Sequence, residues 1–499
     1  MGYSRSWAAA LLIGTSMTSQ SPFVVAQTPA FVEEELRQEL REMRAKLERL
    51  EKRLAQQTGA APSPTQEKKT AQPGAPAADP ALQDRVDALD QQVRVLGRKQ
   101  EIAQGEKAAK DIPAVIAGAS GLDVRSADGQ FELKFRGVVQ TDGRFFLGDS
   151  VGTDTFFLRR VRPIFEGTLY GIYDFRIMPV FGGGKANVQD AYVDARFKPY
   201  AKLLVGKSKA PVGLERWQTD VDTRFVERAF PTDLTPNRDI GIELHGDLGN
   251  RLLEYEVGVF NGSVDGGSSE AFTNEQDNNI DKEYTARLFA LPFRNVPGAL
   301  QDLGLGIGMS YGNLGGSSPA AGLATIQQTS LPTYNTPAQQ AFFSYRTAAP
   351  SATYANGQRL RWAPQAYWYY KSFGVLGEYV IVDQDVARNL SPAAAARAKL
   401  RNSAWQVQLS YLLTGEDESF YRIKPLRAFE IGKPGWGAFE LVARYSELTV
   451  DPAAFSGGSN SFADPTVSAH NAVAWAVGLN WYLNSNIKAM FDYEQTRFT

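Results

Sequence analysis

Apolar and polar side chains alternate with a period of two from about residue 129 to the end of the chain. In the stretch "FELKFRGVVQTDGRFF", the apolar side chains that begin at Phe131 and the charged side chains that begin at Glu132 fall on opposite faces. This is the period of a β-strand. The alternating segments run for roughly ten residues or more, and several end in aromatic clusters such as Trp481-Tyr482. Long strands with aromatic ends are typical of sheets that cross a bilayer, where the rings lie at the headgroups.

Backbone groups in lipid must be paired within the protein, so a membrane-spanning sheet has to close on itself. Residues 129–499 are therefore predicted to form an all-β transmembrane barrel of antiparallel strands, apolar outside and charged inside. About fifteen strands are recognisable, from residues 131–147 to residues 487–498, whereas single-chain bacterial barrels have even numbers. We therefore expect about sixteen strands, with the last one missing from this chain and a gap between the segments 487–498 and 131–147. The long polar stretches, including 313–358 and 416–434, are expected to be external loops.

The first 26 residues match the pattern of a secretory signal peptide. Arg5 provides a basic start, "WAAALLI" provides an apolar run, and "VVA" at residues 24–26 provides a small-residue cleavage site. The chain has no cysteine, which also favours export, because the periplasm oxidises thiols. Together with the barrel, these features predict a protein of the bacterial outer membrane.

Two segments before the barrel carry a heptad pattern. Residues 32–57 and 81–104 are predicted to form coiled-coil helices, joined by a Pro/Ala-rich linker at 58–80. The apolar seam positions are Leu36, Leu40, Met43, Leu47, Leu50 and Leu54 in the first segment, and Leu82, Val86, Leu89, Val93 and Leu96 in the second. Such a seam buries itself against another helix, which favours self-association, and a solvated single helix is the alternative. Because these helices precede the first strand, they are expected in the periplasm.

Enzyme chemistry has little support in the sequence. There are two histidines, His245 and His470, and neither an H-E-x-x-H nor a G-x-S-x-G motif is present. We therefore predict no catalysis, no cofactor and no metal site, leaving a barrel lipase with His245 as its base as the remaining enzymatic alternative. The formal net charge of −2 gives no reason to expect nucleic acid as a partner.

The stretch 207–230, "KSKAPVGLERWQTDVDTRFVERAF", combines basic residues with apolar ones such as Leu214 and Phe225. A loop of this length with its own apolar anchors is predicted to fold inwards and narrow the pore. Arginine suits phosphate or carboxylate because its planar fork donates two hydrogen bonds at once. Further basic residues expected to line the pore are Arg136, Arg144, Arg162, Arg176 and Arg444. Acidic residues on the same faces nearly balance them, so a mixed-charge wall that only keeps the pore wet is equally compatible with the pattern.

Several stretches resemble the phosphate-selective porin O and P family. They are "FFLRRVRPIFEGTLYGIYDFRI", "VGKSKAPVGLERWQTD", "SYLLTGE", "GAFELVARYSEL" and "VGLNWYLNSNIK", in this order over most of residues 130–498. The resemblance implies a homotrimeric, sixteen-stranded outer-membrane channel with anion preference. In that family, basic loop residues guide phosphate to a central narrow site.

The resemblance also implies roles for individual residues. Arg159 and Arg160 match paired basic residues of the pore wall, although simple alternation places Arg159 on the outer face, so a local irregularity is required. Arg216 matches a constriction lysine, and Arg228 matches a further arginine.

Two more positions match the family pattern near the constriction. Thr219 corresponds to a small hydroxyl residue there, and Asp190 corresponds to an acidic residue. The chain departs from the pattern at Val221, where a second constriction lysine is expected, and in the long loop 313–358, whose middle carries no charge.

The sequence thus predicts an anion-preferring diffusion channel, with selectivity for phosphate or polyphosphate as a further expectation. Its expected partners are outer-membrane lipid, inorganic anions such as phosphate, and two further copies of the chain in a homotrimer. One alternative is a general non-selective porin. Another is a barrel anchor whose coiled coil tethers it to peptidoglycan or another periplasmic partner.

Overall fold

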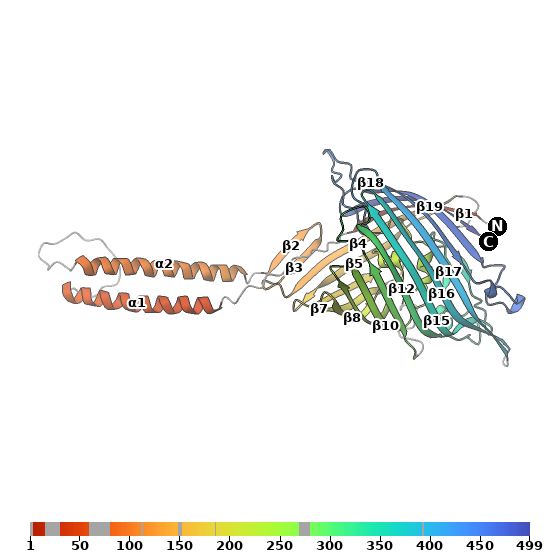
Figure 1. Ribbon diagram of the computed structural model, residues 1–499, viewed down its shortest axis with the longest axis horizontal. Helices are drawn as coiled ribbons and strands as arrows, with labels where there is room; N and C mark the ends of the chain where they lie inside the picture. Colours follow the sequence, from red (N-terminus) through yellow and green to blue (C-terminus); the bar gives the residue numbers. More distant parts are fainter. Residues whose placement is uncertain are drawn as a thin grey trace. The chain divides into compact units, whose positions relative to one another are not determined.

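The computed structural model describes residues 3–14, 30–58, 80–110, 113–147, 152–184, 186–268, 280–391 and 394–499. The chain divides into two compact units, one helical and one built on a large antiparallel sheet (Figure 1).

The helical unit contains α1 (Ala30–Thr58) and α2 (Pro80–Lys110), which contact each other. Along the predicted seams, Met43, Leu47, Val86 and Leu89 are half-buried while most of the residues beside them are exposed. The two predicted helical segments therefore coincide with helices, and their association into a coiled coil stays a prediction. Neither of these helices, nor any other in the described residues, is long and apolar enough to cross a membrane. Residues 59–79, which make up nearly all of the predicted linker, lie outside the described residues.

The sheet is built from strands that follow one another along the chain, each antiparallel to the next. In the described residues, nine strands from β4 to β12 and six from β15 to β20 make fifteen. Their bounds are β4 (Glu132–Leu147), β5 (Thr155–Leu169), β6 (Tyr173–Val180), β7 (Asn187–Lys198), β8 (Ala201–Ser208), β9 (Asp239–Leu248), β10 (Leu253–Phe260), β11 (Glu283–Ala290), β12 (Asp302–Gly315), β15 (Thr353–Tyr370), β16 (Phe373–Ser391), β17 (Ala394–Leu412), β18 (Ala438–Thr449), β19 (Asn471–Tyr482) and β20 (Ile487–Phe498). Each predicted strand overlaps one of these.

Shorter strands complete the sheet unit. β2 (Ala114–Gly118) pairs with β3 (Gly121–Arg125), which in turn pairs with the first residues of β4. β13 (Thr333–Asn335) and β14 (Ala341–Ser344) form a separate two-stranded sheet within the long connection between β12 and β15.

The fifteen strands do not close on themselves, because no ladder in the described residues joins β20 directly to β4. β1 (Tyr3–Gly14) lies between them, antiparallel to both, with Ala9 opposite Phe491 on one side and Gly143 on the other. The gap expected between these two strands is therefore filled by a segment that the sequence assigned to a signal peptide. Two facing edges with unpaired N–H and C=O groups provide the physical reason for this pairing. The rest of the predicted signal peptide lies outside the described residues.

The two faces of the sheet differ as predicted. Outward-facing side chains such as Phe135, Val257 and Phe491 are 44%, 52% and 52% exposed. The inward-facing Arg136 and Arg287, in contrast, are buried. An apolar outer face and a charged interior are what a barrel in lipid requires.

The connection 413–437 differs from expectation, since the sequence predicts that most of it, residues 416–434, forms an external loop. The Leu412 amide donates to the Ser372 carbonyl at 2.8 Å, and the Glu418 amide to the Lys371 carbonyl at 2.5 Å. The connection therefore lies at the end of the sheet that carries the two-residue turn between β15 and β16. Because successive strands reverse direction, the segment after β17 returns to the end where β16 began.

Candidate functional site

Residues 209–238, between β8 and β9, form a long loop that folds into the interior of the sheet. We call it the inward loop. It contains the short helix α3 (Leu214–Trp217) and the 3₁₀ turn η1 (Phe230–Leu234). Leu214, Phe225 and Phe230 are at most 1% exposed, which fits the apolar anchors that the sequence analysis identified.

The inward loop is tied to strands on several sides of the interior. The Leu214 amide donates to Glu378 of β16 at 2.7 Å, and the Val226 amide donates to Asp492 of β20 at the same distance. Arg238, at the end of the loop, donates to Asp190 of β7 at 2.9 Å. Contacts with strands so far apart along the sheet show that the loop crosses the interior.

The inward loop also approaches β12 very closely. A Cβ atom on Gly308 would stand 2.2 Å from the carbonyl oxygen of Val212, so only glycine fits there without a shift of the backbone.

Replacing Gly308 with alanine is expected to push the inward loop away from β12 and to change the single-channel conductance in planar bilayers. Overpacking of this kind lowers the free energy of unfolding by roughly 1–3 kcal/mol. Gly137→Ala is the matched control, because its new Cβ would meet the Arg162 carbonyl at an ordinary 3.5 Å. Equal conductance in both variants would contradict a close contact at Gly308.

A β-bulge brings Arg159 and Arg160 to the same side of the sheet. The register between β4 and β5 passes from Gln140 opposite Arg160 to Thr141 opposite Leu158, which leaves Arg159 as the extra residue. A bulge redirects a side chain that simple alternation would send outwards. Arg159 Nε accordingly lies 2.5 Å from Glu227 in the inward loop. The irregularity required by the sequence is therefore present.

Two carboxylates of the inward loop gather the arginines around them. Asp220 forms ion pairs with Arg160 at 3.3 Å, with Arg228 at 2.5 Å and with Arg162. Burial by itself raises the pKa of Asp220, but these arginines outweigh that effect, so the net pKa lies well below its usual value. The three arginines therefore stabilise the ionised form of Asp220.

Glu227 is surrounded in the same way. It pairs with Arg144 at 2.7 Å and with Arg159 at 2.5 Å, and Arg160 lies 3.8 Å away. Burial raises its pKa, and Arg159 and Arg160 outweigh that effect, so that its pKa falls to about 2.

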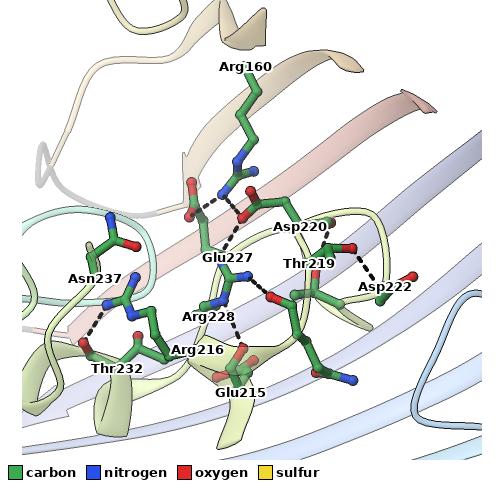
Figure 2. A network of polar contacts seen from close by, with 12 residues as sticks. Arg160, Glu215, Arg216, Thr219, Asp220, Asp222, Glu227, Arg228, Thr232 and Asn237 are labelled. Atoms are coloured by element: carbon green, nitrogen blue, oxygen red, sulfur yellow. Dashed lines mark hydrogen bonds and ion pairs between the residues drawn. The ribbon is translucent and has the colours of Figure 1, made fainter. Parts of the chain in front are cut away.

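Arg216 differs from these arginines. Its guanidinium donates to the Thr232 carbonyl oxygen (Figure 2). Among the described residues, no carboxylate forms an ion pair with Arg216 within 4 Å, and Asp220 pairs instead with Arg160, Arg162 and Arg228. The buried Nε atom has no hydrogen-bond partner. Burial lowers the pKa of Arg216 to about 9, with Arg228 and Arg238 adding to the effect, so the side chain remains charged at neutral pH.

These side chains line a cavity of about 330 Å³, which we call the arginine chamber. Its charged lining consists of Arg159, Arg160, Arg162, Arg216, Arg228, Asp220, Glu227 and Asp233. Burial raises the pKa of Asp233 to about 7, so this carboxyl is partly neutral. Five guanidiniums against three carboxyl groups leave the lining net positive.

Comparison with known families decides what kind of protein carries this chamber. The sequence model described as "Phosphate-selective porin O and P" matches residues 131–497. The chain belongs to this family. It is a porin, an outer-membrane channel, in agreement with the apolar outer face and charged interior of its sheet.

Solved structures of outer-membrane proteins are similar to part of this porin. A loop-deletion mutant of OmpT from Vibrio cholerae has 10% identity and a TM-score of 0.39, covering 74% of this chain and 100% of that one. An anion-selective porin from Comamonas acidovorans has 8% identity and a TM-score of 0.37, with the same coverage. The outer-membrane channel DcaP of Acinetobacter baumannii has 10% identity and a TM-score of 0.38, covering 74% of this chain and 98% of that one. Among curated proteins, nothing matches.

Four of the constriction residues expected in this porin meet at the arginine chamber, namely Arg159, Arg160, Arg216 and Arg228. The other two do not line it. Thr219 donates from Oγ1 to Asp222 at 2.6 Å, and Asp190 pairs with Arg238 and Arg176.

Of the five arginines expected along the pore wall, Arg162 lines the chamber, and all five have acidic partners. Arg136 and Arg176 share Glu166, and Arg444 pairs with Glu494 at 3.2 Å. Arg144 and Arg162 pair with Glu227 and Asp220 of the inward loop.

Sequence reasoning missed Asp220 and Glu227. Both stand among the basic residues of "QTDVDTRFVER", so acids placed beside arginines within one loop were the available signal. Alternation says nothing about a loop, however, and the wall arginines that hold these acids come from β4 and β5.

Proposed function

We propose that this porin is an anion-preferring diffusion channel whose constriction is the arginine chamber. The observation that carries the proposal is the net positive lining, in which five arginines meet three carboxyl groups around about 330 Å³. Cationic rings favour anions because fixed charges replace part of the hydration that an ion loses in a narrow passage. The guanidinium fork suits oxyanions, and inorganic phosphate is the solute that the family description suggests.

Within this proposal the predicted residues have different roles. Arg159, Arg160, Arg216 and Arg228 provide the cationic lining. Asp190 acts indirectly, because it holds Arg238 at the end of the inward loop, whereas Thr219 bonds to Asp222 and does not line the chamber.

Current measurements in a KCl gradient test the proposal. For the channel in a planar bilayer, we expect a reversal potential of the sign that chloride permeation produces, and we expect added inorganic phosphate to reduce the chloride current. A reversal potential near zero would favour a general non-selective porin. A potential of the opposite sign would reject anion preference.

We also propose that the channel is a homotrimer. In this trimer, α1 and α2 of each chain would associate with the same helices of the other copies in the periplasm. The half-buried seam positions Met43 and Leu89 support this, because a further helix would cover them more completely. A variant that lacks residues 27–110 tests the alternative hypothesis that the protein is a barrel anchor with a periplasmic tether. A tether predicts loss of attachment to the cell envelope with unchanged conductance.

A further inference from the structure

The carboxylates of the inward loop occupy the positions that a solute anion would take. Each of Asp220 and Glu227 faces three guanidiniums, and Arg160 belongs to both groups. The remaining partners of Asp220 are Arg162 and Arg228, and those of Glu227 are Arg144 and Arg159. A carboxylate held by three guanidiniums is what an occupied oxyanion site looks like.

We propose that Asp220 and Glu227 are tethered counter-ions that fill the arginine sites and thereby set how strongly this porin binds a passing anion. The inference rests on the proposed anion preference and specifies which residues limit it.

Competition explains the effect. A carboxylate attached to the loop is always present at its site at a high effective concentration, so a free oxyanion must displace it before it can use the same arginines. The affinity of Arg160, Arg162 and Arg228 for a free anion is consequently lower than it would be without Asp220. Weak binding also allows the anion to leave, which a conducting pore requires.

Arg216 is the exception that leaves room for a solute. Because no carboxylate among the described residues lies within 4 Å of it, its guanidinium can donate hydrogen bonds directly to an incoming anion. The anion path then runs past Arg216, while Asp220 and Glu227 occupy the guanidiniums of the other arginines.

A neighbouring acid provides a matched comparison. Asp222 lies two residues after Asp220 in the same loop, and its carboxylate accepts from Thr219 at 2.6 Å. Among the described residues, no arginine or lysine lies within 4 Å of this carboxylate, and Arg422, which interacts with it electrostatically, does not line the arginine chamber. Neutralising Asp222 therefore changes the charge of the loop by the same amount without releasing an arginine of the chamber.

The test compares Asp220→Asn with Asp222→Asn in planar bilayers and measures the inorganic phosphate concentration that halves the chloride current. Asp220→Asn is expected to lower this concentration about tenfold, since hydrogen bonds to a charged group become available to phosphate. Asp222→Asn is expected to change it by less than about twofold. Equal shifts in the two variants would overturn the inference, because they would reflect net charge and not the release of particular arginines.

A second variant covers the case in which Asp220→Asn does not form channels. Glu227→Gln releases the other group of arginines and is likewise expected to lower the half-blocking phosphate concentration about tenfold. A wild-type channel without anion preference would defeat the proposed function itself. A wild-type channel with anion preference, combined with an unchanged phosphate block in Glu227→Gln or Asp220→Asn, would defeat the counter-ion role alone.

Discussion

Replacing Arg224 with alanine is expected to release the inward loop and to raise the single-channel conductance. Arg224 is 2% exposed and pairs with Glu418 at 2.5 Å and with Glu440 at 2.7 Å. It also donates to the backbone carbonyl of Asp222 at 2.6 Å. A single side chain therefore joins the loop to β18 and to the connection that precedes it.

The expected size of this effect follows from burial. Removing one partner of a buried ion pair leaves an uncompensated charge and costs about 3–5 kcal/mol, much more than a surface pair contributes. In Arg224→Ala the two carboxylates would remain buried and face each other without their cation. We expect the loop to leave its place across the interior, which widens the path for ions.

Single-channel conductance and thermal unfolding in detergent measure this outcome together. Arg401→Ala is the control, because Arg401 has a mostly exposed side chain and pairs with Asp383 at 2.7 Å. We expect the control to behave like the wild type. An Arg224→Ala channel with wild-type conductance and wild-type unfolding temperature would mean that Arg224 does not hold the loop.

Replacing Arg216 with alanine is expected to weaken phosphate block of the chloride current about tenfold and to reduce anion preference. Arg216 is the chamber arginine whose guanidinium has no carboxylate within 4 Å among the described residues, so its removal strands no acidic partner. The effect should therefore appear in solute binding rather than in folding. Arg216→Lys should retain part of the preference, because lysine keeps the charge and loses the planar fork.

Arg346→Ala provides the control for this second experiment. Arg346 pairs with Asp464 at 2.7 Å and does not line the arginine chamber. Its replacement removes one positive charge and should leave the phosphate block unchanged. If Arg216→Ala and Arg346→Ala gave the same block as the wild type, the chamber would not be the constriction.

Most of the sheet could be predicted from the sequence, because the period of two is a local property of each strand. The faces of β4 and the end of β20 at Phe498 could be read this way. The irregularity at Arg159 follows from the family resemblance together with this period, because the resemblance places Arg159 and Arg160 both in the pore and a regular strand would send Arg159 outwards. The fold of the inward loop followed from its apolar anchors, Leu214 and Phe225, which need an interior to bury them.

Local patterns could not assign connections to the ends of the sheet. Length and polarity predict that residues 416–434 form an external loop, which is wrong, because these two properties do not record strand direction. The hydrophobic run within Tyr3–Gly14 likewise gives no local sign that this segment pairs with β4 and β20.

The alternation of apolar and polar residues and the apolar anchors of the loop are enough to predict a membrane sheet with an apolar outside, a charged inside and an arginine-bearing loop within. Which of those arginines meet an acid depends on the tertiary structure. Asp220 and Glu227 reach Arg162 and Arg144 across more than fifty residues of chain. Such pairings depend on where distant strands bring their side chains, and no local period of the sequence carries that information.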